Sequence, residues 1–193
     1  MGDEGQELIK VGMEVALKPV TDIASDVLGI AGGAWLHEQH ERIRRRLRDR
    51  TEEIFKERGV KEPQEPPPSV IVPLLTHAQN ETREELLDLW AKLIAASMDP
   101  QRSHLYRREY VDIVKRLEPL DARALRRLPT MQGGGINQRD QMASEFKVNH
   151  GEVEVAFRNL VSLELGAPPQ GQTVVSGFLL ITALGTELLR VLA

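Results

Sequence analysis

EELLDLWAKLIAASMDP, residues 84–100, is the stretch that decides the fold. Its large apolar residues recur at spacings of three and four, which places them on one face of a helix: Leu86, Leu87, Trp90, Leu93, Ile94 and Met98. Glu84 and Glu85 fall in the first turn, where the helix dipole favours negative charge. Pro100 ends the helix, because proline disfavours a helical conformation of the residue before it. The stretch therefore predicts an amphipathic helix.

YVDIVKRLEPLDARALRRL, residues 110–128, predicts two more helices. The second begins near Pro119, with Asp121 in its first turn. Aromatic residues make up only 4% of the chain, so the core is built mainly from Leu, Val, Ile and Ala. This composition favours helices packed on helices.

Together the two segments resemble the bacterial abortive-infection alpha family. The resemblance rests on a Leu-Trp-Ala-x-Leu helix that ends in Met98-Asp99-Pro100, followed by the pattern YVxIxxxLxPLDA from Tyr110 onward. It covers roughly residues 66–193. It implies antiviral defence in a bacterium, by abortive infection, and it implies no particular chemistry.

The sequence of the first two thirds of the chain predicts three structural regions. Residues 1–60 predict long helices with a break at Pro19 and a C-cap at Gly59. Residues 61–68, KEPQEPPP, contain four prolines and predict an extended linker that lets the N-terminal helices move. Residues 69–132 predict a central helical domain.

Residues 133–193 predict a winged-helix-like unit. Helices are expected at 137–147, with Asn137 as N-cap, and at 152–165. Residues 172–182 are rich in β-branched side chains and predict a small β-hairpin, and residues 183–192 predict a closing helix. The predicted fold class is therefore mainly α, a helical bundle with long N-terminal helices and a small hairpin near the C-terminus.

Composition and charge exclude several classes of protein. The absence of cysteine excludes disulfides, thiolate metal sites and cysteine catalysis. The net charge of −4 argues against a general nucleic-acid-binding protein. The acidic N-terminus is no secretory signal, and no apolar run reaches the ~20 residues of a membrane span. We expect a cytoplasmic protein, with peripheral membrane contact as one option.

An apolar stretch near the N-terminus is a candidate for self-association or membrane contact. Ser25, Gly29 and Gly33 form a small-xxx-small series, and Trp35 would suit a membrane interface. Asp22 interrupts the stretch, so close packing inside a helical bundle or a homodimer is the alternative. We expect a homo-oligomer or a protein partner.

Two basic stretches are candidates for an anionic partner. The first contains Arg42, Arg44, Arg45, Arg46, Arg48 and Arg50. The second, residues 102–127, contains Arg107, Arg108, Lys115 and Arg116. The alternative for both is a solvated helix face, since Glu38 precedes Arg42 by four residues, the better orientation for an ion pair.

No pattern predicts catalysis, a metal or a cofactor. His37 and His40 have a spacing seen in metal sites but no third ligand, and Gly133–Gly135 lacks the Lys of a P-loop. Within residues 152–165, Glu residues outnumber the single Arg158. A helix with this negative charge is unsuited to sequence-specific binding in the DNA major groove. We expect a non-enzymatic defence effector or adaptor that acts through protein–protein or membrane contact. The alternative is a nucleic-acid-binding module that uses residues 42–50 and 102–127.

Overall fold

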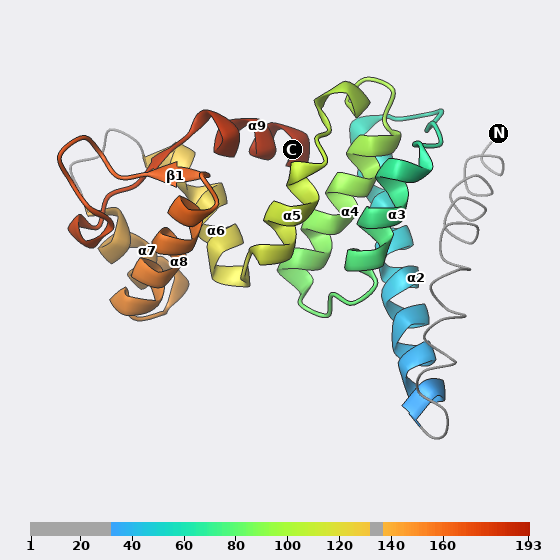
Figure 1. Cartoon of the computed structure of the whole chain (residues 1–193), viewed down its shortest axis with the longest axis horizontal. Coiled ribbons are helices and arrows are strands. Elements are labelled where there is room, and N and C mark those ends of the chain that lie inside the picture. Colours follow the sequence, from blue (N-terminus) through green and yellow to red (C-terminus); the bar gives the residue numbers. More distant parts are fainter. Residues whose placement is uncertain (1–31, 132–136) are drawn as a thin grey trace. The chain divides into compact units, whose positions relative to one another are not determined.

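The computed structural model describes residues 32–131 and 137–193, which are mainly helical with one small antiparallel sheet (Figure 1). The chain forms two compact units, one ending at Lys115 and the other running from Arg116 to Val191. The first unit therefore contains the described part of the predicted N-terminal region, from residue 32 onward. It also contains most of the predicted central region. The reason is the packing of the longest helix on the Trp90 helix.

Helix α2 (Gly32–Arg58) packs along helix α4 (Glu84–Met98) in the first unit. The apolar stripe of α2 is buried, as its spacing predicts: Ile43, Leu47, Ile54 and Phe55. Gly59 follows with a φ of 68°, a left-handed conformation that glycine adopts without strain, so the predicted C-cap is confirmed. On α4, Trp90 is 2% exposed, which places the indole in the core.

Helix α3 (Pro68–Ala78) also packs against α4 and continues through Pro73. Residues 61–67 of the predicted linker have no helix or strand, whereas its last residue, Pro68, begins α3, and the segment is not detached from the unit. The Gln64 N–H donates to the Met98 carbonyl oxygen at 2.8 Å, and Pro66 is buried. The middle of the predicted linker is therefore anchored at the C-terminal end of α4.

A short 3-10 turn, η1 (Ser103–Leu105), and helix α5 (Glu109–Arg116) follow α4. The buried face of α5 is Tyr110, Val111, Ile113 and Val114. Three of them, Tyr110, Ile113 and Val114, stand at the spacing of three and four residues that places side chains on one helix face. The last residue of α5 already belongs to the second unit.

The second unit contains helices α6 (Pro119–Arg127), α7 (Gln138–Phe146) and α8 (His150–Ser162), with a 3-10 turn, η2 (Leu128–Met131), after α6. Helix α8 packs against both α6 and α7. Its buried residues, Val153, Ala156, Phe157 and Leu160, form the centre of this unit. The predicted N-cap is confirmed, because the Asn137 side chain accepts a hydrogen bond from the Asp140 N–H at 3.3 Å.

The unit ends with the strands β1 (Gly166–Ala167) and β2 (Leu180–Ile181), the turn η3 (Val174–Ser176) and helix α9 (Ala183–Leu192). The bounds of α9 are those predicted. The hairpin differs from the prediction, since Gly166 pairs with Ile181 and only the end of 172–182 is strand. A side chain at 166 would collide with Leu179, so glycine there permits close strand approach.

Candidate functional site: a groove along helix α8

An open groove of about 870 Å³ lies between the start of α6 and the length of α8. All its walls belong to the second unit. Glu118, Leu120 and Asp121 contribute from α6 and the residue before it. The α8 side runs from Asn149 to Ser162 and includes Gly151, Glu152, Val155, Ala156, Arg158 and Asn159.

Both helix starts that line the groove are closed by reciprocal capping. The Glu118 carboxylate accepts the Asp121 N–H, and Asp121 Oδ2 accepts the Glu118 N–H at 2.8 Å. At α8, Asn149 Oδ1 accepts the Glu152 N–H at 2.9 Å, and Glu152 Oε2 accepts the Asn149 N–H at 2.8 Å. Each capping box satisfies two backbone donors that would otherwise lack partners, so both walls begin at fixed positions.

Asn159 joins the two walls. Its Nδ2 donates to Asp121 Oδ2 at 2.5 Å and to the Arg116 carbonyl oxygen at 3.0 Å. Asp121 is only 3% exposed. Burial raises the pKa of this carboxyl group above its ordinary value, although the hydrogen bonds from Glu118 and Asn159 act in the opposite direction. A nearly buried carboxyl group thus forms part of the groove wall.

Val155 is the most exposed large apolar residue among those that the structure describes, at 67%. It lies two residues from both Val153 and Phe157, and side chains two apart on a helix point in different directions. Val155 therefore faces away from the core and into the groove, beside the small Ala156. An isolated exposed valine is common, but here it sits in the apolar part of a concave surface.

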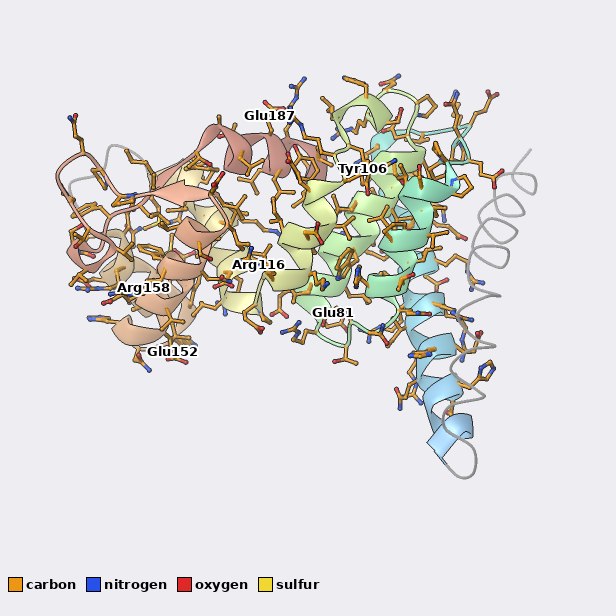
Figure 2. All side chains as sticks on the ribbon, viewed as in Figure 1. Glu81, Tyr106, Arg116, Glu152, Arg158 and Glu187 are labelled. Atoms are coloured by element: carbon orange, nitrogen blue, oxygen red, sulfur yellow. The ribbon has the colours of Figure 1, made fainter. Side chains whose placement is uncertain are left out.

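The groove carries more negative than positive side chains. Glu118, Asp121 and Glu152 line it, against one cation, Arg158. Figure 2 shows Glu152 and Arg158 at separate positions along α8. The guanidinium of Arg158 is held by Glu154, with Nη2 at 2.7 Å and Nε at 3.2 Å from Oε1.

The structure distributes the arginines of residues 42–50 around α2. Arg44 reaches Glu41 at 2.6 Å and Gln79 at 3.5 Å, and Arg46 pairs with Glu84 of α4. Arg50 Nε lies 2.9 Å from Asp88 Oδ1, also on α4.

The outward-facing arginines of α2 also have partners. Arg42 pairs with Glu38 at 3.3 Å, Arg48 with Asp49 at 3.2 Å, and Arg45 Nε donates to the Glu41 carbonyl oxygen at 3.4 Å. These arginines therefore do not form one continuous basic face.

The second basic stretch is exposed. Arg107 lies 3.5 Å from Glu109, Arg108 is exposed immediately before α5, and Lys115 is exposed on α5. Arg116 is exposed and belongs to the second unit (Figure 2). An anionic partner for these residues stays a prediction.

The predicted self-association residues fall largely beyond the described part of the chain. Ser25 and Gly29 lie outside it. Gly33 and Trp35 fall in the first turns of α2, where only the backbone is described. Within residues 32–131 and 137–193, no helix is long and apolar enough to cross a membrane. The same residues contain no group of three or more His, Cys, Asp or Glu placed to hold a metal, and His40 instead contacts Asn80 at 3.2 Å.

Comparison with known proteins identifies the family. A family model described as abortive infection alpha matches residues 39–166, about two thirds of the chain. The chain belongs to the abortive infection alpha family. The resemblance found in the sequence is thus confirmed, and the family suggests abortive-infection phage defence. No curated protein and no solved structure matches the chain.

In this abortive infection alpha chain, sequence patterns missed the groove. Its two walls are about 40 residues apart in sequence, so no local spacing brings Asp121 and Asn159 together. One signal was available at Val155. Because one face of α8 is apolar and buried, polar residues are expected on its opposite face. Val155 is apolar but lies in the middle of that opposite face.

Proposed function

We propose that this chain is a phage-defence protein that acts without catalysis, by binding a protein partner in the α8 groove. The observation that carries the proposal is the exposure of Val155 inside a concave surface whose walls are fixed by two capping boxes and by Asn159. A preformed apolar site with a few placed polar groups is typical of a binding surface. Family membership supplies the biological context.

We further propose that the second unit is winged-helix-like. The order of helices α6, α7 and α8, followed by an antiparallel strand pair, supports this. In DNA-binding relatives of that architecture, the helix at the position of α8 enters the major groove. Here Glu152 and Glu154 would meet phosphates, so a protein ligand fits this helix better than DNA.

The alternative, a nucleic-acid-binding module, has less support. The first basic stretch is engaged in ion pairs with neighbouring carboxylates, and breaking those pairs would oppose phosphate binding. Purified protein that carries a nucleic-acid absorbance at 260 nm, removed by salt, would favour the alternative.

The test of the proposal is a phage challenge of bacteria that express the chain. Val155→Asp places a charge in the groove without altering the core, so we expect normal protein levels and loss of protection. Val175→Asp is the matched control, because Val175 is 54% exposed and is not part of the groove. Full protection by Val155→Asp at wild-type protein levels would overturn the proposal.

A further inference from the structure

We propose that the ligand of the groove is a cationic amphipathic helix, with an apolar side chain against Val155 and with Lys or Arg facing Glu118, Asp121 and Glu152. This inference rests on the proposed function, because it specifies the partner of the same groove. Three observations carry it: the charge of the walls, the shape of the groove, and the charge of the chain's own N-terminal segment.

The charge of the walls selects a cationic ligand. Three of the four ionisable side chains that line the groove are carboxylates, and the fourth, Arg158, is held by Glu154 outside it. Asp121 is nearly buried, so part of this negative charge is shielded from water. A cation that enters opposite it interacts in a lower dielectric than at an open surface. Charge complementarity of this kind sets specificity and association rate.

The shape of the groove selects a helix. Its longer wall follows α8 from Asn149 to Ser162, and at about 1.5 Å per residue this is roughly 20 Å. Gly151 and Ala156 keep that wall low, so a second helix can approach closely. Helix-in-groove recognition uses apolar anchors spaced three and four residues apart, and Val155 offers one contact for them.

The chain's own N-terminal segment does not fit this description. Residues 1–31 contain six acidic residues and two lysines, the same sign of charge as the groove. Like charges across an interface cost free energy, so this segment is disfavoured as the occupant. The ligand is therefore expected to come from another protein.

The experiment measures binding of a fluorescein-labelled model peptide to the purified full chain by anisotropy. The probe peptide has Leu at helical spacing and Lys at the remaining positions. A second peptide has Glu for Lys, and a third has Ser for Leu. We expect binding of the Lys peptide alone, with an affinity that falls as salt is added.

Variants then locate the site. Val155→Ser, which removes the apolar contact without adding negative charge to the groove, should weaken binding of the Lys peptide about tenfold, the result of losing roughly 1.4 kcal/mol. Glu118→Gln with Glu152→Gln should weaken it about threefold to tenfold, since glutamine keeps the capping hydrogen bonds and removes the charge. Val175→Ser and Glu187→Gln, both outside the groove, should bind as wild type does.

The outcomes separate this inference from the proposed function. Equal binding of the Lys and Glu peptides, or Lys-peptide binding that ignores both groove variants, overturns the inference. In either case a loss of phage protection in Val155→Asp leaves the proposed function standing, with a different ligand. Self-association of the wild-type chain that Val155→Asp abolishes would make a second copy the occupant and would also overturn the inference.

Discussion

The imidazole of His77 stacks on the indole of Trp90, with ring centroids 6.3 Å apart and planes inclined by 26°. Trp90 lies in the core on α4, whereas His77 is partly accessible near the end of α3. Burial lowers the pKa of His77, and the nearby charge of Lys115 lowers it further. The pair therefore links a titratable group to a fluorescent reporter in the first unit.

Trp90 fluorescence should report the protonation of His77. Because the pKa is lowered in the folded state, the unfolded chain binds the proton first as the pH falls below about 6.5. Stability is therefore lost as the pH falls through the folded pKa. In a Trp35→Phe background, we expect quenching along the same transition, and His77→Gln should remove both effects. An emission that stays constant as the pH is lowered from 7 to the onset of acid unfolding would contradict the prediction.

Trp90→Ala should cost about 3–5 kcal/mol of unfolding free energy, because a large aromatic side chain in a packed core leaves a cavity. Urea unfolding followed by circular dichroism measures this. Trp90→Phe keeps most of the volume and should cost clearly less. A midpoint unchanged by Trp90→Ala would mean that the indole is not packed.

Glu81→Gln should destabilise the start of α4. Burial raises the pKa of Glu81, but hydrogen bonds from Arg83 and the Thr82 N–H outweigh it, and the net pKa is lowered. The stabilisation is present above the unfolded pKa of about 4.5 and is lost as the pH falls. We expect a cost of about 1–3 kcal/mol at pH 7 and a smaller difference at pH 4.

The control for Glu81 is Glu85→Gln. Glu85 is exposed in the first turn of α4, where a carboxylate contributes only about 0.3–1 kcal/mol through the helix dipole. Chemical unfolding of both variants at the two pH values separates the two contributions. Equal effects of the two substitutions would argue against a special role for Glu81.

Asp121→Asn should stabilise the second unit at neutral pH. The pKa of Asp121 is raised, so its folded form binds the proton more tightly, and stability falls as the pH rises from 3.8 through the folded pKa. Asparagine is neutral, and its oxygen still accepts the bonds from Glu118 and Asn159. The midpoint of thermal unfolding should therefore depend less on pH in this variant.

Asp121→Ala is the matched contrast. This substitution removes the carboxylate that accepts hydrogen bonds from the Glu118 N–H and from Asn159 Nδ2. Losing these two hydrogen bonds should cost about 1–3 kcal/mol of unfolding free energy. If Asn and Ala had the same effect at pH 7, the hydrogen bonds of Asp121 would not matter for stability.

Local patterns predicted the helices well where one face is buried and the ends carry caps. Asn137, Gly59 and the bounds of α9 illustrate this. Helix α8 begins at His150, two residues before the predicted start, because Asn149 is its N-cap, whereas Asn is equally common in turns. Its side chain offers the same hydrogen bonding in either role, so the sequence alone does not separate them.

Longer-range features were beyond local patterns. Gly166 has the sequence signature of a helix C-cap, yet it lies in a strand against Leu179. Similarly, the arginines after Glu41 form a cluster in the sequence, but the helix turns them towards α3, α4 and solvent. In both cases the residue's position depends on a contact with a residue distant in the sequence. The same is true of the two walls of the groove.

The anchoring of Gln64 and Pro66 has a consequence for how the protein responds to cleavage. A proline-rich segment between helices is a usual site for proteolytic nicking. A chain nicked at Lys61 would still be joined through the buried interface of α2 with α4, and the hydrogen bond from Gln64 to Met98 would hold the new end of the C-terminal fragment against α4. The two fragments should therefore elute together from a sizing column and separate only in denaturant, which makes the chain suitable for fragment complementation.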